Sequence, residues 1–227
     1  VNNGAWYSLP LSTSGAAGIT LGAGSGASNQ ASSGIAIGDN AAGSYQNSNA
    51  VALGVYAGQD HQGSNAVAIG NSAGQTGQQG SAVAIGYKAG STLQSAQSIA
   101  IGANAAQYYQ QPQSIAIGYQ ACFTGQGTQS VAIGVQSGFT NQYVGAVAIG
   151  YQAGYNVTTG QNNICIGYSA GSYGIGLTTG EENILIGNYT RTTAVGSQYQ
   201  FVLGYDIQSA GNNTITIGAS GTKIYNT

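Results

Sequence analysis

The chain has 227 residues, of which 39 are glycine and only 4% are charged, and its formal net charge is −2. Three basic side chains cannot form the patch that nucleic acids or anionic membrane surfaces require, which excludes both as partners. A hydrophobic content of 42% argues against disorder, and no apolar stretch reaches the ~18 residues of a membrane-spanning helix.

Residues 1–18 precede the first repeat, and we expect them to form an N-terminal cap. Trp6, Leu9 and Leu11 are predicted to cover the end of a stack of strands, which would otherwise be an adhesive edge. The segment lacks the basic start and the continuous apolar core of a secretory signal peptide.

Residues 19–154 repeat with a period of 16, marked by a glycine that follows Ile or Leu. The regular glycines are Gly22, Gly38, Gly54, Gly70, Gly86, Gly102, Gly118, Gly134 and Gly150. In residues 155–227 the same signature recurs at steps of 17, 20, 17 and 14 residues, at Gly167, Gly187, Gly204 and Gly218. A fixed period of this length indicates stacked repeats, and the later steps indicate irregular turns with insertions.

Each glycine ends a short alternating pattern, as in Val67-Ala68-Ile69 before Gly70. This period of two predicts a β-strand with Ile or Val on one face and Ala on the other. We expect the Ile and Val to be buried between turns, and the row of Ala to lie where a neighbouring chain approaches closely. Small pairs such as Ala57-Gly58 predict a second strand or a turn, with the Ala pointing inward.

Glutamine lies eight residues after the glycine in eight consecutive repeats. In stacked strands ~4.8 Å apart, such side chains can form hydrogen bonds from turn to turn, so the sequence predicts an amide ladder. Thr158 takes this position in the next repeat, where the ladder is expected to end. The predicted ladder residues are Gln30, Gln46, Gln62, Gln78, Gln94, Gln110, Gln126 and Gln142.

Together these patterns predict an all-β fold, a parallel β-solenoid of about 13 turns with a 16-residue repeat. Such a stack would form a rod on the order of 60 Å long. The repeat motif, for example Ser130-Val131-Ala132-Ile133-Gly134, resembles the head repeats of trimeric autotransporter adhesins. That resemblance implies a left-handed parallel β-roll and a homotrimer, although repeats in that family are often shorter than 16 residues.

The later repeats are similar to those of tail-fibre proteins from phages and large DNA viruses, as in residues 154–164 and 211–218. Both resemblances imply an extracellular location, as a cell-surface fibre or a virion appendage. In tail-fibre proteins this pattern can precede a self-cleaving chaperone domain.

No constellation of catalytic residues is predicted, so we expect no enzymatic activity, no cofactor and no metal site. His61, the only histidine, is expected in a solvated loop, and the acidic residues form no facing pair. Cys122 and Cys165 occupy positions for small residues, two to three turns apart, so both are expected to be buried without a disulfide.

Three sequons are candidate N-glycosylation sites, at Asn156, Asn188 and Asn212. Tyrosines such as Tyr87 and Tyr119 recur just after the repeat glycine. They could stack on sugars, but packing between turns is the favoured interpretation.

The sequence therefore predicts a structural extracellular fibre protein that self-associates, as a homotrimer with possible end-to-end assembly. The first alternative is an adhesin or viral receptor-binding fibre, in which the insertions near residues 156–164 and 172–182 recognise host glycans. The second alternative is an ice-binding rod, although the chain lacks a repeated threonine row.

Overall fold

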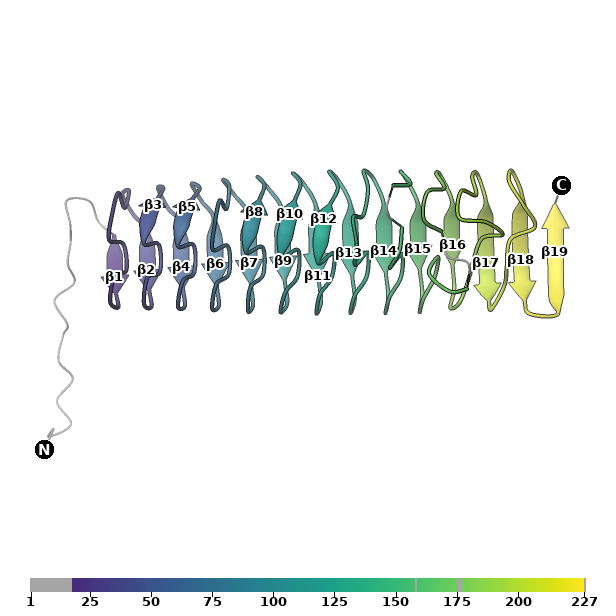
Figure 1. Cartoon of the computed structure of the whole chain (residues 1–227), viewed down its shortest axis with the longest axis horizontal. Helices are drawn as coiled ribbons and strands as arrows, with labels where there is room; N and C mark the ends of the chain where they lie inside the picture. The colour runs from purple at the N-terminus through teal and green to yellow at the C-terminus, as the bar shows by residue number, and fades with distance from the viewer. Residues whose placement is uncertain (1–17, 158, 175–176, 227) are drawn as a thin grey trace, which may run out of the picture.

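The computed structural model describes residues 18–226, except residues 158 and 175–176, and it describes the side chains up to residue 221. Within these residues all regular structure is β-strand, and the strands stack in order along one long axis (Figure 1). The all-β parallel solenoid is confirmed. The predicted cap residues Trp6, Leu9 and Leu11 lie outside the described residues.

One 14-stranded sheet runs the length of the molecule and is called the long sheet below. Its first thirteen strands pair in parallel, and the last strand is antiparallel to its neighbour. The thirteen parallel strands mark the beginning and end of twelve complete turns, close to the predicted 13. The strands are β1 (Ile19–Leu21), β2 (Ile35–Ile37), β4 (Val51–Leu53), β6 (Val67–Ile69), β7 (Val83–Ile85), β9 (Ile99–Ile101), β11 (Ile115–Ile117), β13 (Val131–Ile133), β14 (Val147–Ile149), β15 (Ile164–Ile166), β16 (Ile184–Ile186), β17 (Phe201–Tyr205), β18 (Ile215–Ala219) and β19 (Thr222–Asn226).

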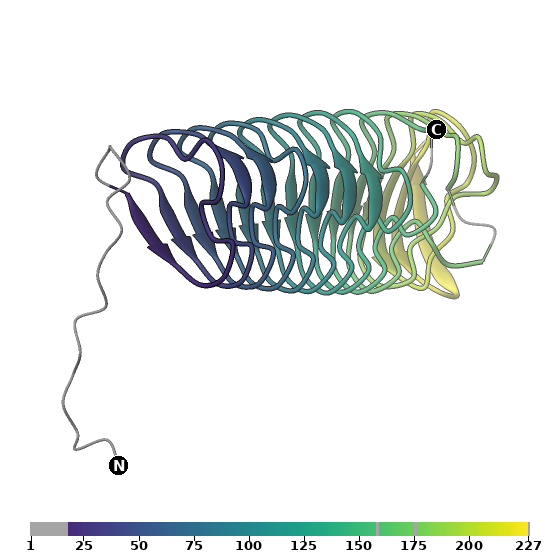
Figure 2. The same cartoon turned by 60° about the vertical axis from the view of Figure 1, so that its left-hand side comes forward.

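A second layer of strands lies across the coil from the long sheet, as the turned view shows (Figure 2). It consists of a two-stranded and a three-stranded sheet. Isolated β-bridges from Thr76 to Asp60 and to Thr92 connect the two sheets. We call this layer the short sheet; its strands are β3 (Ser44–Gln46), β5 (Asp60–Gln62), β8 (Thr92–Gln94), β10 (Tyr108–Gln110) and β12 (Thr124–Gln126). The small pairs such as Ala57-Gly58 form the turn between the two layers, with Ala57 buried.

The register of the long sheet follows the spacing of the repeat glycines. Every pair from β1 to β14 joins residues 16 apart, for example Val131 with Val147. Val147 then pairs with Ile164, and Ile164 with Ile184. Insertions therefore lengthen the loops of the later turns, while the strands stay aligned on the same rows.

The prediction of which strand face is buried was wrong. The middle alanines, such as Ala84 and Ala100, are completely buried, whereas the flanking Ile and Val are only partly covered. Leu21 and Leu53 on this outer face are 46% and 42% exposed. The interior between the two layers is already occupied by Ala from the turns and Gln from the short sheet, so branched side chains must point outward.

The glycine that ends each strand of the long sheet is required by its conformation and by the next turn. At Gly86, φ is +125°, a value that side-chain-bearing residues rarely adopt. A Cβ atom there would also lie 2.8 Å from the carbonyl carbon of Gly102. The close approach of successive backbones therefore explains why the repeat never replaces this glycine.

Larger apolar side chains enter the interior only in the C-terminal turns. Leu185 and Val202 continue the buried row that Ala148 and Cys165 occupy in preceding turns. Leu177 and Ile207, on the longer loops, are also fully buried. The insertions widen these turns, which makes room for residues that the regular coil excludes.

Candidate functional site: the internal amide ladder and the outer faces

The glutamines at the end of the short-sheet strands form a continuous ladder inside the coil. Each Nε2 donates to the Oε1 of the glutamine one turn later, at 2.9–3.0 Å through six steps and at 3.5 Å in the last. Six of the eight side chains are 0% exposed. The ladder residues are Gln30, Gln46, Gln62, Gln78, Gln94, Gln110, Gln126 and Gln142.

The same amides also join the short sheet to the long sheet. Gln94 Nε2 donates to Gln110 Oε1 at 3.0 Å and to the carbonyl of Val83, in β7, at 2.8 Å. Its own Oε1 accepts a hydrogen bond from Gln78 Nε2 at 3.0 Å. Each buried amide thereby has partners for its donor and acceptor, which removes the large cost of an unpaired polar group.

A second buried amide row, which the sequence reasoning missed, follows in the irregular turns. Asn183 Nδ2 donates to Asn163 Oδ1 at 2.9 Å, and the backbone N–H of Gln200 donates to Asn183 Oδ1 at 3.2 Å. These residues lie four positions before the repeat glycine, where earlier turns carry Gly, Ala or Ser. The signal in the sequence that could have predicted this row is an asparagine directly before the strand, as in Asn163-Ile164 and Asn183-Ile184.

The outer face of the long sheet is completely apolar, and we call it the aliphatic face. The first and third residues of each parallel strand point outward, two in each of 13 strands, or 26 in all. Every one is Ile, Val or Leu except Phe201. Parallel sheets normally have both faces covered by other parts of the protein, so an apolar face open to solvent is unusual.

Aromatic side chains stack between turns along two other rows. Phe123, Phe139 and Tyr155 stack with ring centroids 5.4 and 4.8 Å apart. Tyr151 and Tyr168 stack at 4.8 Å and remain 40% and 43% exposed. Contacts between turns, the interpretation favoured from the sequence, account for these stacked rings, whereas Tyr87 and Tyr119 stack on no ring of the described residues and are 50% and 49% exposed.

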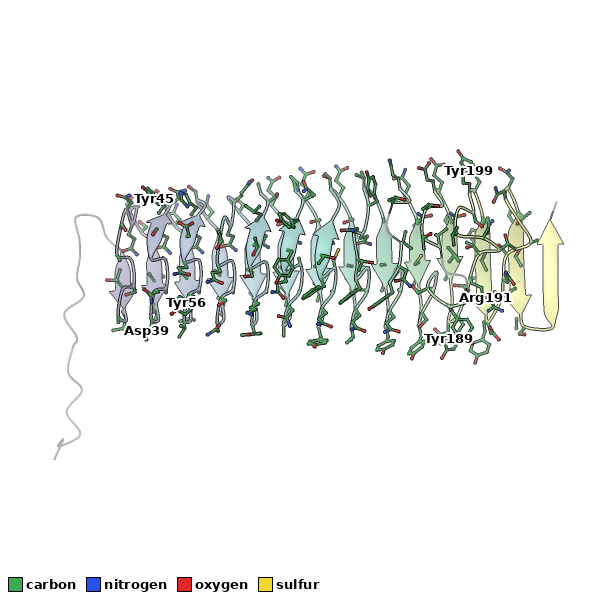
Figure 3. All side chains as sticks on the ribbon, in the orientation of Figure 1. Asp39, Tyr45, Tyr56, Tyr189, Arg191 and Tyr199 are labelled. Atoms are coloured by element: carbon green, nitrogen blue, oxygen red, sulfur yellow. The ribbon has the colours of Figure 1, made fainter. Side chains whose placement is uncertain are left out.

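A cluster of tyrosines near the C-terminal end contains one of the two ion pairs among the described residues. Arg191 Nη1 lies 2.6 Å from Asp206 Oδ1, and its guanidinium lies over the ring of Tyr173. Tyr189, labelled with Arg191 in Figure 3, contacts three other tyrosine rings. Desolvation, followed by the neighbouring phenols and Asp206, raises the pKa of Tyr189.

The expected placement of His61 in a loop was wrong, because it lies in strand β5. Its ring stacks on Tyr45 with centroids 4.7 Å apart, and its Nδ1 lies 2.7 Å from Asp60 Oδ1. The side chain is exposed and points away from the interior. No group of three His, Cys, Asp or Glu side chains able to hold a metal ion occurs in the described part of the chain.

Cys122 and Cys165 are both buried free thiols. Burial raises the pKa of Cys165 from its ordinary 9.0 to about 12. Burial also raises the pKa of Cys122, against a smaller opposing effect of its hydrogen bond with the Gln142 backbone. Each thiol fills a position that holds alanine in other turns, such as Ala106 and Ala148.

The three candidate glycosylation asparagines are all exposed, on the C-terminal turns. Asn188 Oδ1 accepts a hydrogen bond from the backbone N–H of Tyr168 at 3.0 Å. Asn212 Oδ1 accepts from the backbone N–H of Gln198 at 3.0 Å. Two of the three amides therefore hold neighbouring turns together.

Comparison with protein-family models, curated proteins and solved structures gives no match to this chain. The resemblance to adhesin heads and tail fibres thus depends on the repeat motifs alone. Within the described residues, no helix could cross a bilayer.

We predict that Gln94→Leu destabilises the protein by about 3 kcal/mol, because it removes three hydrogen bonds, with Val83 O, Gln78 Nε2 and Gln110 Oε1, and leaves Gln110 Oε1 without its donor. The measurement is the midpoint of urea unfolding. Gln97→Leu makes the same chemical change in an exposed amide pair and should alter stability by at most about 0.5 kcal/mol. Equal losses in the two variants would contradict a structural role for the ladder.

The buried thiols predict a loss of stability at alkaline pH. Below pH 9 both thiols are protonated in the folded and unfolded chains; between pH 9 and about 12 only the unfolded chain releases the protons. Stability should then fall by up to about 1.4 kcal/mol per pH unit for each thiol. The double variant Cys122→Ala, Cys165→Ala should lose stability less steeply over this range in urea unfolding at pH 8–11. Parallel pH profiles for parent and variant would refute the assignment.

Proposed function

We propose that this protein is a structural rod whose aliphatic face associates side by side with other copies of the same chain. The observation that carries the proposal is the continuous outward row of Ile, Val and Leu along the long sheet. Soluble monomers rarely expose contiguous apolar patches of more than a few hundred Å², so an apolar face along an entire sheet needs a partner.

A second copy of the chain is the partner that best fits this face. Flat apolar rows at the same spacing on two copies can interdigitate along their full length, as the faces of stacked sheets do. No charged residue occupies an outward position of the thirteen parallel strands. With a net charge of only −2, the copies also repel one another weakly.

The ends of the stack favour lateral association over a continuous end-to-end sheet. Strand β19 pairs antiparallel with β18, which ends the parallel register at the C-terminal end. A following copy could not simply continue the repeat there. Three rods packed around their aliphatic faces would bury every such face, which is the arrangement we propose, in an extracellular fibre.

The proposal predicts that Ile101→Lys with Ile133→Lys converts the assembly to monomers. Each lysine would place a charge in the buried contact between copies, which is strongly unfavourable. Light scattering with size-exclusion chromatography should give a trimer mass for the parent and a monomer mass for the variant.

The matched control is Tyr45→Lys with Leu93→Lys, two outward residues of the short sheet that are 49% and 48% exposed. That variant should keep the parent mass. A parent that is monomeric at micromolar concentration, or an aliphatic-face variant that keeps its assembly, would overturn the proposal.

A further inference from the structure

The outer surface of the short sheet lacks outward side chains at one turn. Its outward side chains come from the residues before and after each ladder glutamine. At Gln110 these are Tyr109 and Gln111, but at Gln126 both are glycine, Gly125 and Gly127. No other regular turn has glycine at both positions. The following turn packs directly against these two glycines, because a Cβ atom at Gly127 would lie 2.5 Å from the carbonyl carbon of Tyr143.

The surface at these glycines is part of a groove with a volume of about 460 Å³, within the usual range for small-molecule sites. Gly125 and Gly127 are among the residues that line it. The preceding turn contributes Tyr109, and the following turn contributes Asn141 and Tyr143.

The groove walls combine aromatic rings with free amide and hydroxyl groups. Tyr109 and Tyr143 are 56% and 41% exposed, so their rings are available for contact. Gln111, Thr128 and Asn141 line the same groove, and their side chains make no hydrogen bond within the described structure. None of the residues that line the groove is charged.

We propose that this groove binds a neutral saccharide of one or two rings. A pyranose has an apolar C–H face, which suits a tyrosine ring, and a hydroxyl edge, which suits amide donors and acceptors. Tyrosine provides rigid amphipathic contact area at a small entropic cost. The absence of cationic groups among the lining residues disfavours acidic sugars, which would lose their hydration without gaining a counter-charge.

This site does not depend on the proposed self-association. The groove lies on the short sheet, and the aliphatic face lies on the outer side of the long sheet. A rod assembled through the aliphatic face would therefore present one groove per chain on its outer surface, which is a repeated array of sites. Weak single sites on such an array would bind a multivalent surface more tightly than one chain could.

The test is a substitution that adds a bulky side chain to the groove lining, Gly125→Leu. Leu93 holds the equivalent position two turns earlier with a similar positive φ, +53° against +68° at Gly125, so the fold tolerates leucine there. A Cβ atom at Gly125 would overlap the amide end of the flexible Asn141 side chain, which must move aside, and would lie 3.3 Å from the Asn141 Cα. Gly77→Leu is the matched control, because Gly77 has the same φ and an equivalent position outside the groove.

Binding of cellobiose, lactose, chitobiose and sialyllactose would be measured by ligand-observed NMR and calorimetry on the assembled parent and both variants. We expect at least one neutral disaccharide to bind, Gly125→Leu to weaken it by roughly tenfold or more, and Gly77→Leu to leave it unchanged. Tyr143→Ala should weaken binding as well, without filling the groove.

Three results would overturn the site: no binding of any neutral probe to the parent, binding of sialyllactose alone, or equal binding by Gly125→Leu and the parent. The oligomeric mass of each variant is measured in parallel. If a variant loses saccharide binding but keeps the oligomeric mass of the parent, the groove has failed and the self-association has not.

Discussion

The narrowness of the coil is the constraint on which the rest of the structure depends. The two layers lie so close that the long sheet can place only a small residue inside, and the short sheet contributes a flat amide. Gln78, Gln94 and Gln110 meet this constraint because each amide bonds to the copies above and below and to the long-sheet backbone. The backbone glycines, which touch the next turn directly, maintain the same close stacking.

A thin interior leaves little apolar surface to bury within one chain, and this explains the outward Ile and Val. In most domains these residues would form the core, but here Ala84 and Ala100 do so. In the proposed assembly, the rod would gain further hydrophobic stabilisation when copies pack together, which would couple its stability to its assembly. In that proposed arrangement the short sheet, on the opposite side of the coil, would stay free to contact other molecules.

Sequence periodicity predicted the strands, their register and the buried glutamines, because each depends on spacing along the chain. It did not predict which strand face is buried, since alternation identifies two faces without showing which one the second layer covers. The row of Asn163, Asn183 and Gln200 was missed because its spacing is irregular. The groove was missed because two glycines in a glycine-rich chain give no signal until neighbouring turns are placed beside them.

The measurement that tests this account most directly is thiol labelling at two adjacent strand positions. In a chain with both native cysteines replaced by alanine, Ala100→Cys and Ile101→Cys would be treated with a maleimide at a dilution that keeps the protein monomeric. The buried position of Cys165 shows that a thiol fits the inner row. The account predicts rapid labelling at residue 101 and strong protection at residue 100. Protection at 101 with rapid labelling at 100 would contradict it.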